Sequence, residues 1–180
     1  MPGAGKSTVA SFLKEKGFAV VTMGDAVREE ASIQGLEPTD ANLGQLMLKL
    51  RHDLGQGAIA HLVLKKLERD KSHGNTVIDG IRGIHEVEVL KRSGHVKLLA
   101  IHASQDTRFR HLRERGRSDA PASSDDFTGR DKRELSVGIS EAIALADETL
   151  SNNELTFEQL KQEACRIVEE WLAETRGPSS

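Results

Sequence analysis

A glycine-rich run near the start of the chain contains the first residues whose types and order can carry out chemistry. Gly3-Ala4-Gly5-Lys6-Ser7-Thr8 supplies the later part of a phosphate-binding loop, in which a glycine and four further residues precede Gly-Lys-Ser/Thr. Glycines let backbone N–H groups turn toward phosphate oxygens, and the N-terminus of the following helix adds partial positive charge. In such a loop Lys6 reaches the β- and γ-phosphates, and the hydroxyl of Ser7 binds Mg²⁺. The run predicts a nucleoside triphosphate site rather than a glycine-rich helix start without a ligand.

The same pattern is incomplete at its N-terminal end. Its first glycine would fall one position before Met1, and the apolar strand that leads into such a loop has no counterpart in the sequence. That strand is central in a sheet of this type. If the strand buries about five aliphatic residues at roughly 1.5–3 kcal/mol each, its loss would cost about as much free energy as the net stability of a whole domain. We therefore expect the biological chain to start upstream of Met1, and the alternative is a weakened fragment.

A carboxylate and a guanidinium follow the first apolar run of the sequence. Phe18-Ala-Val-Val-Thr22 is typical of a strand buried on both faces, and Asp25 and Arg28 lie three residues apart after it. Arg28 can hold the phosphate of an acceptor in a bidentate fork, and Asp25 can take the proton from an attacking hydroxyl. The pattern predicts an acceptor-binding segment over about residues 25–71. The alternative is a helix-capping aspartate beside a solvated arginine.

Another carboxylate and arginine mark the end of the second apolar run, Thr76-Val-Ile-Asp79. Asp79 stands where a strand-ending carboxylate holds the water shell of Mg²⁺, and Arg82 is placed to bind the transferred phosphate and the acceptor. An Asp-Gly pair at the end of a strand is also a common turn. With a phosphate-binding loop in the same chain, we predict a metal site at Ser7 and Asp79. We also predict a catalytic and acceptor-binding role for Arg82.

Basic residues are concentrated between residues 108 and 133. They are Arg108, Arg110, Arg113, Arg115, Arg117, Arg130, Lys132 and Arg133. We predict a lid over this range, with Arg115 binding the nucleotide and with Arg117 and Arg130 neutralising charge in the transition state. The alternative, which we expect to hold for some of them, is a solvated, charged helix. A nucleic-acid surface is disfavoured because the net charge is −3 and aromatic side chains are few.

Helix and strand patterns alternate along the chain. Short apolar runs predict strands at 18–22, 76–79, 96–102 and 149–151. Helices are predicted at 6–16, 25–33, 43–52, 56–71, 84–93, 105–115 and 156–174; a polar stretch at 116–129 precedes another helix to about 146, and the tail 176–180 is expected to be frayed. Such alternation is typical of a parallel sheet with helices on both faces, whose ligands bind at the carboxyl ends of the strands.

Length and composition limit the class of protein. The 180 residues, 29% charged and 37% hydrophobic, predict one globular domain over residues 1–180 that folds without a disulfide or structural metal. We expect no membrane span, because no apolar run approaches 18 residues, and no signal peptide, because the N-terminus has no apolar core. The single Cys165 fits a cytoplasmic location. The oligomeric state and the preference for ATP or GTP are left open by these residues.

Several motifs together resemble those of one protein family. They are, in chain order, Gly3 to Thr8, Met23-Gly-Asp25 with Arg28, Asp79-Gly-Ile-Arg82, Arg115-Gly-Arg117-Ser-Asp119, Arg130-Asp-Lys-Arg-Glu134, and Ala146-Asp147 with Asn152. Over residues 1–174 this order is similar to the archaeal family of adenylate-kinase-like, dephospho-CoA-kinase-related P-loop proteins. The resemblance implies an α/β P-loop NTPase of the nucleoside-monophosphate-kinase type. Its parallel sheet has the order 2-3-1-4-5, with strand 1 largely absent here, helices on both faces and an Arg-rich lid.

The resemblance also implies that ATP and Mg²⁺ are bound. The leading hypothesis is a kinase that transfers the γ-phosphate of ATP to a small nucleotide-like acceptor. The resemblance leaves open whether the acceptor is of the adenylate-kinase type or of the dephospho-CoA-kinase type. The alternative is an ATP-binding or slowly ATP-hydrolysing regulatory protein without a small acceptor.

Overall fold

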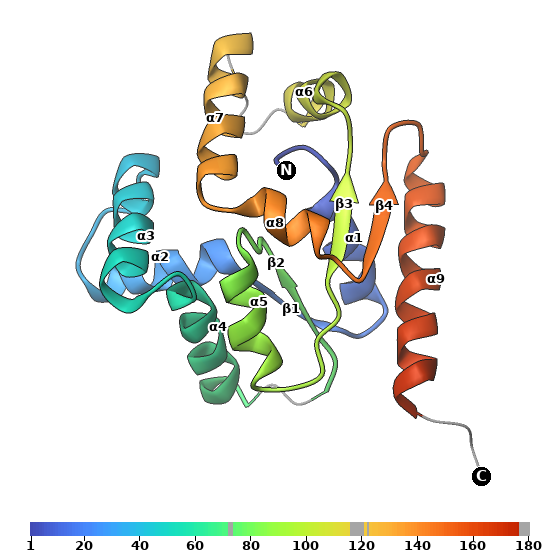
Figure 1. Cartoon of the computed structure of the whole chain (residues 1–180), viewed down its shortest axis with the longest axis horizontal. Coiled ribbons are helices and arrows are strands. Elements are labelled where there is room, and N and C mark those ends of the chain that lie inside the picture. Colours follow the sequence, from blue (N-terminus) through green and yellow to red (C-terminus); the bar gives the residue numbers. More distant parts are fainter. Residues whose placement is uncertain (72–73, 116–120, 122, 177–180) are drawn as a thin grey trace.

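Short strands alternate with helices along the chain (Figure 1). The computed structural model describes residues 1–71, 74–115, 121 and 123–176. The strands are β1 (Ala19–Thr22), β2 (Thr76–Asp79), β3 (Leu99–His102) and β4 (Glu148–Ser151). The helices are α1 (Lys6–Glu15), α2 (Met23–Ile33), α3 (Asp40–Leu54), α4 (Ala58–Arg69), α5 (Ile84–Lys91), α6 (Gln105–Glu114), α7 (Ser124–Ser136), α8 (Ile139–Ala144) and α9 (Phe157–Arg176). None of these described helices has both the length and the apolar character that crossing a lipid bilayer requires.

The strands form two separate parallel pairs. β1 pairs with β2 so that Thr22 lies opposite Asp79, and β3 pairs with β4 so that His102 lies opposite Ser151. The predicted order 2-3-1-4-5 contains the same two pairs, joined by the strand that would lead into the phosphate-binding loop. Within the described ranges no strand joins β2 to β3, so the α/β class is confirmed but one continuous sheet is not seen.

Each strand pair has its own hydrophobic core. Around β1 and β2, helices α2 to α5 enclose buried side chains that include Val27 and Ile59. Around β3 and β4, helices α1 and α9 enclose a second cluster that includes Phe12 and Ile101. Figure 1 shows α2, α3 and α4 on one side of the molecule and α9 along β4 on the other. The two halves meet at α1, which contacts β1, β2 and α9.

Several predicted boundaries shift by two or three residues, as for α3 and β3, and one region differs more. α7 begins at Ser124, inside the stretch predicted to be non-helical, because Ser123 and Asp126 form a capping box. The helix predicted to reach about residue 146 is instead two helices, α7 and α8, separated by Gly138 in the left-handed conformation. Arg176 is the last residue of α9, and the rest of the tail predicted to be frayed (177–180) lies outside the described residues.

Candidate nucleotide-binding site

The glycine-rich loop depends on two glycines before it enters α1. Gly3 and Gly5 have φ angles of 79° and 106°, in the left-handed region that other residues rarely adopt. A Cβ atom at Gly3 would lie 2.5 Å from the carbonyl oxygen of Arg108, and one at Gly5 would lie 2.6 Å from the side-chain nitrogen of Asn152. Both positions therefore require glycine, and Ala4 between them is completely buried.

Side chains from two other parts of the fold hold the loop in place. The buried amide of Asn152, directly after β4, donates from Nδ2 to the carbonyl oxygen of Ala4 at 3.0 Å. The guanidinium of Arg108 on α6 donates from Nη1 to the carbonyl oxygen of Pro2 at 3.2 Å. These bonds fix the loop backbone between the end of β4 and α6.

Lys6, the first residue of α1, lies at the inner end of the loop. Its Nζ donates to the carbonyl oxygen of Met1 at 2.8 Å. Burial lowers the pKa of Lys6 below its ordinary value, although the nearby carboxylates of Asp79 and Glu134 oppose the shift. Since negative charge favours the protonated amine, an anionic ligand at the loop would stabilise the charged form of Lys6.

Ser7 and Asp79 meet at the end of β2. The hydroxyl of Ser7 donates to Oδ2 of Asp79 at 3.1 Å. Hydroxyl and carboxylate oxygens are the ligand types that Mg²⁺ prefers, and this ion usually takes only one or two carboxylates together with phosphate oxygens and water. The pair therefore fits a Mg²⁺ site completed by a nucleotide. In the part of the chain that the structure describes, no group of three or more His, Cys, Asp or Glu side chains could hold a metal ion alone.

Asp25 and Arg28 lie together on the first turns of α2. The hydroxyl of Thr22 caps this helix by accepting from the N–H of Asp25 at 2.9 Å, so Thr22 and not Asp25 is the capping residue. Nη1 of Arg28 donates to Oδ1 of Asp25 at 2.8 Å. Both side chains are more than half exposed, at 56% for Asp25 and 57% for Arg28. Solvent competes for such a pair, so its partners exchange at little cost.

Arg82 follows β2 and is held at both its backbone and its side chain. Its N–H donates to Oε2 of Glu86 at 2.8 Å, and Glu86 is itself buried in an ion pair with Arg51 at 2.7 Å. Its Nε lies 2.7 Å from Oε2 of Glu134 on α7. Residues of α3, α5 and α7 thus converge on this one arginine.

One cavity of about 1110 Å³ brings the predicted site residues together. Its lining includes Gly3, Gly5, Lys6, Ser7, Thr8, Asp25, Arg28, Asp79, Arg82, Arg115 and Arg130. Ala4 is buried behind the loop surface, and Arg117 lies outside the described residues. The candidates for phosphate, metal and acceptor binding therefore share a single cavity.

The basic segment contains arginines of different kinds. Arg115 and Arg130 line the cavity, whereas Arg108 is buried. Its Nη1 and Nη2 donate to the two carboxylate oxygens of Asp131 at 2.8 and 2.5 Å, and its guanidinium lies 4.9 Å from the ring centre of Phe127. Arg108 therefore joins α6 to α7 and cannot act as a surface residue of a lid.

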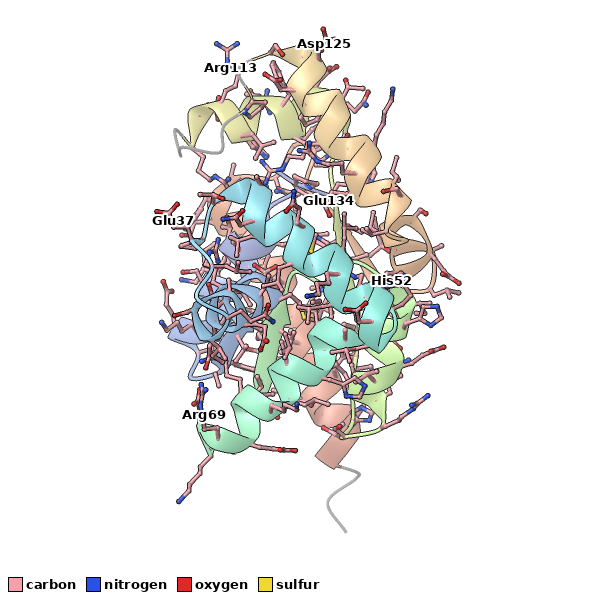
Figure 2. The ribbon with its side chains drawn as sticks, turned by 90° about the vertical axis from the view of Figure 1, so that its left-hand side faces the viewer. Glu37, His52, Arg69, Arg113, Asp125 and Glu134 are labelled. Carbon is pink, nitrogen blue, oxygen red and sulfur yellow. The ribbon has the colours of Figure 1, made fainter. Side chains whose placement is uncertain are left out.

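Sequence reasoning gave no role to Glu134, Asp131 or Asn152. The side chain of Glu134 is only 12% exposed. Arg113 and Asp125, by contrast, are exposed and lie at the outer end of the molecule (Figure 2). Glu134 and Asn152 occurred only within motifs of the family resemblance. The spacing of Asp131 and Glu134, three residues apart, was a signal that both lie on one helix face.

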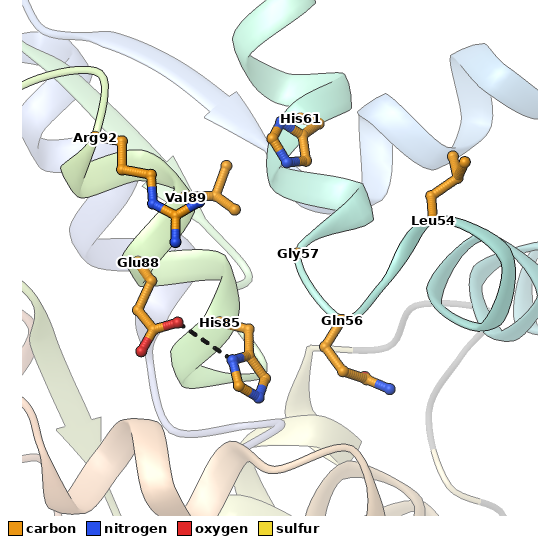
Figure 3. A pocket seen from close by; sticks show the side chains of 8 residues that line it. All are labelled: Leu54, Gln56, Gly57, His61, His85, Glu88, Val89 and Arg92. Carbon is orange, nitrogen blue, oxygen red and sulfur yellow. Dashed lines mark hydrogen bonds and ion pairs between the residues drawn. The ribbon is translucent and has the colours of Figure 1, made fainter.

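A smaller hollow lies between the α3–α4 turn and α5 (Figure 3). Its volume is about 250 Å³, and His61 and Arg92 are part of its lining. Within it, Nδ1 of His85 lies 3.2 Å from Oε2 of Glu88. None of the predicted site residues lines this hollow, so it is separate from the candidate nucleotide site.

An α/β fold in which a glycine-rich loop leads into a helix beside a strand-ending carboxylate defines a P-loop nucleotide-binding domain. A family model described as an AAA domain matches residues 1–127. The chain is 42% identical over 176 residues to a UPF0200 protein of Pyrococcus abyssi, covering 96% of this chain and 94% of that protein. It is 41% identical over 173 residues to a UPF0200 protein of Methanocaldococcus jannaschii, covering 96% and 87%. The chain belongs to the UPF0200 family of archaeal proteins.

A solved structure is similar over nearly the same range. The crystal structure of TT1252 from Thermus thermophilus matches with a TM-score of 0.58 over 93% of each chain, at 19% sequence identity. At this level of identity the match supports the fold alone. The P-loop class predicted from the sequence is confirmed, and nucleotide binding, typically with Mg²⁺, follows from that class.

Proposed function

We propose that the chain is an ATP- and Mg²⁺-dependent phosphotransferase that acts on a small nucleotide-like acceptor, as adenylate kinases or dephospho-CoA kinases do. The observation that carries this proposal is the contact between Ser7 and Asp79 inside a cavity that Asp25, Arg28 and Arg82 also line. A site for the nucleotide alone does not need this second group of charged residues.

On the nucleotide side, Lys6 and the backbone N–H groups of the loop bind the phosphates of ATP. Ser7 and Asp79 hold Mg²⁺, which, when bound, neutralises charge on the phosphate oxygens. Arg115 contacts the nucleotide and Arg130 acts at the transferred phosphate, and Arg117 is a prediction of the same kind.

On the acceptor side, Arg28 and Arg82 bind the anionic group of the acceptor. Asp25 takes the proton if the acceptor attacks through a hydroxyl, and has no such task if a phosphate oxygen attacks. The acceptor-binding segment is then about 25–71 and the lid about 108–133 of a single domain. The resemblance to nucleoside-monophosphate kinases, with sheet order 2-3-1-4-5, and a cytoplasmic location belong to the same proposal.

Thermal unfolding of the chain with and without Mg-ATP tests the nucleotide half of the proposal, with Lys6→Ala as the matched control. At about 100 times its dissociation constant, ATP should stabilise the chain by roughly 2.7 kcal/mol. We expect a rise in melting temperature that Lys6→Ala removes. An ATP shift of equal size in Lys6→Ala, or none in either chain, would contradict ATP binding at this loop.

A second candidate is an ATP-binding or slowly ATP-hydrolysing regulator without a small acceptor. The observation in its favour is that both acceptor-side arginines are paired with carboxylates of the chain, Arg28 with Asp25 and Arg82 with Glu134. ATP consumption measured against a panel of nucleoside monophosphates and dephospho-CoA separates the two candidates. A kinase consumes ATP faster when its acceptor is added, and a regulator does not respond to the panel.

A further inference from the structure

Two of the carboxylates on helix α7 each reach an arginine from a different half of the molecule. Asp131 pairs with Arg108 of α6, which follows β3. Glu134 pairs with Arg82, which follows β2. Because the two carboxylates are three residues apart, they lie on one face of the helix. The same face of α7 therefore contacts both the element that supports the phosphate loop and the arginine on the acceptor side.

The two ion pairs differ in their surroundings. The Arg108 and Asp131 side chains are 5% and 7% exposed, and Arg108 also donates to a loop carbonyl. The Arg82 and Glu134 side chains are 32% and 12% exposed, and both line the large cavity. The first pair is a fixed structural contact, whereas the second faces the space where a ligand binds.

The backbone of Arg82 does not depend on Glu134. Its N–H is bonded to the buried carboxylate of Glu86, which Arg51 holds in turn. Losing the contact with Glu134 would therefore release Nε of Arg82 without releasing the chain that carries it, and Nη1 would keep its weak hydrogen bond to Sδ of Met47 at 3.3 Å. The side chain is then able to exchange one anionic partner for another.

We propose that Glu134 competes with the phosphate group of a ligand for Arg82, so that an anion binds there only after displacing this carboxylate. The inference rests on the proposed function, because it takes Arg82 as the arginine that binds the acceptor or the transferred phosphate. A phosphate monoester carries nearly twice the charge of a carboxylate at neutral pH, so it displaces Glu134 where a neutral group does not. Glu134 thereby selects for phosphate-bearing ligands at this position.

The test is a titration of four chains with inorganic phosphate, in which thermal unfolding is the readout of binding. They are the unsubstituted chain, Glu134→Gln, Arg82→Gln and the double variant. We expect Glu134→Gln to bind phosphate about five- to tenfold more tightly, as removal of a partly exposed competing charge allows. In the Arg82→Gln background the same substitution should change the affinity little, because the arginine for which Glu134 competes is gone.

Further variants separate competition at Arg82 from a change in the overall charge of the chain. Glu163→Gln, which removes an exposed carboxylate paired with Arg166 on α9, is the matched control and should leave phosphate binding unchanged. Glu134→Asp keeps the charge on a shorter side chain, should give an intermediate gain, and replaces Glu134→Gln if that chain fails to fold. Equal gains with and without Arg82 would overturn the inference in favour of a general charge effect. A weaker or unchanged affinity in Glu134→Gln, or no phosphate binding in any chain, would also overturn it.

The outcome is distinguishable from that of the proposed function. If the Lys6-dependent Mg-ATP shift were absent but the four chains differed in phosphate affinity as expected, the proposed kinase function would be contradicted. The competition at Arg82 would still stand. A normal Mg-ATP shift, together with no gain in phosphate affinity from Glu134→Gln, would contradict only the competition.

Discussion

The buried ion pair between Arg108 and Asp131 gives a sharp prediction for stability. Asp131→Asn removes the negative charge but keeps the size of the side chain and one acceptor oxygen. Removing one partner of a buried pair costs about 3–5 kcal/mol, because the other charge stays in a place where water cannot solvate it. Since the side chains of Arg108 and Asp131 are only 5% and 7% exposed, water has little access to either. We expect a loss near the lower limit, about 3 kcal/mol, because the asparagine still accepts one hydrogen bond.

The measurement is urea unfolding together with thermal unfolding of the same chains. A loss of about 3 kcal/mol corresponds to a decrease of roughly 6–12 °C in melting temperature for a chain of this size. Arg108→Met should cost more than Asp131→Asn, because it also leaves the carbonyl oxygens of Pro2 and Ala103 without their donor. Glu163→Gln is the surface control and should change stability by no more than about 0.5 kcal/mol.

Two results would refute this reasoning. A loss below about 1 kcal/mol for Asp131→Asn would mean that the pair behaves like a surface salt bridge. The reverse ranking, with Asp131→Asn more destabilising than Arg108→Met, would mean that the bonds from Arg108 to the loop and to the end of β3 contribute nothing.

Three further predictions concern the cavity. Ser7→Ala and Asp79→Asn should each raise the Mg²⁺ concentration needed for half-maximal stabilisation by ATP, measured by thermal shift; an unchanged requirement would exclude them as ligands. With a hydroxyl acceptor, Asp25→Asn should lower kcat by about 10²- to 10⁴-fold, and a loss of only a few-fold would exclude it as the base. Because burial lowers the pKa of Lys6 and a triphosphate favours its charged form, ATP binding should take up protons and weaken as the pH rises through that lowered pKa. Calorimetry in buffers of different ionisation enthalpy measures this uptake, and proton release would contradict the assignment.

Local sequence signals were sufficient for most of the elements. The apolar run 76–79 is β2 residue for residue, and the predicted helix 6–16 differs from α1 by one residue at its end. Both depend on short-range patterns that packing did not override. The start of α7 was missed because the residues around it are polar and the Ser123–Asp126 capping box carries the signal instead of hydrophobic spacing.

The candidate site was predictable where its chemistry follows from a motif and its position from a strand end. Ser7 and Asp79 were expected to meet because the loop and β2 end at the same edge of a parallel sheet, and they do. Glu134 could not be found in this way. Its role depends on the contact with Arg82, which comes from a distant segment of the chain. Sequence spacing does not specify contacts between distant segments. Arg108 was grouped with the other basic residues of 108–133 for the same reason. Its burial, which distinguishes it from the cavity-lining Arg115, follows from contacts that the sequence does not show.

The arrangement of the strands gives α7 a particular importance for the chemistry. Within the described residues, no ladder of hydrogen bonds links β2 to β3. The loop is tied to the β3–β4 half through Asn152 and Arg108, whereas Arg82 belongs to the β1–β2 half. The position of Arg82 relative to the loop therefore depends on α1, which contacts both halves, and on the two ion pairs of α7. A ligand that displaces Glu134 would loosen one of these pairs and leave the Asp131 pair intact.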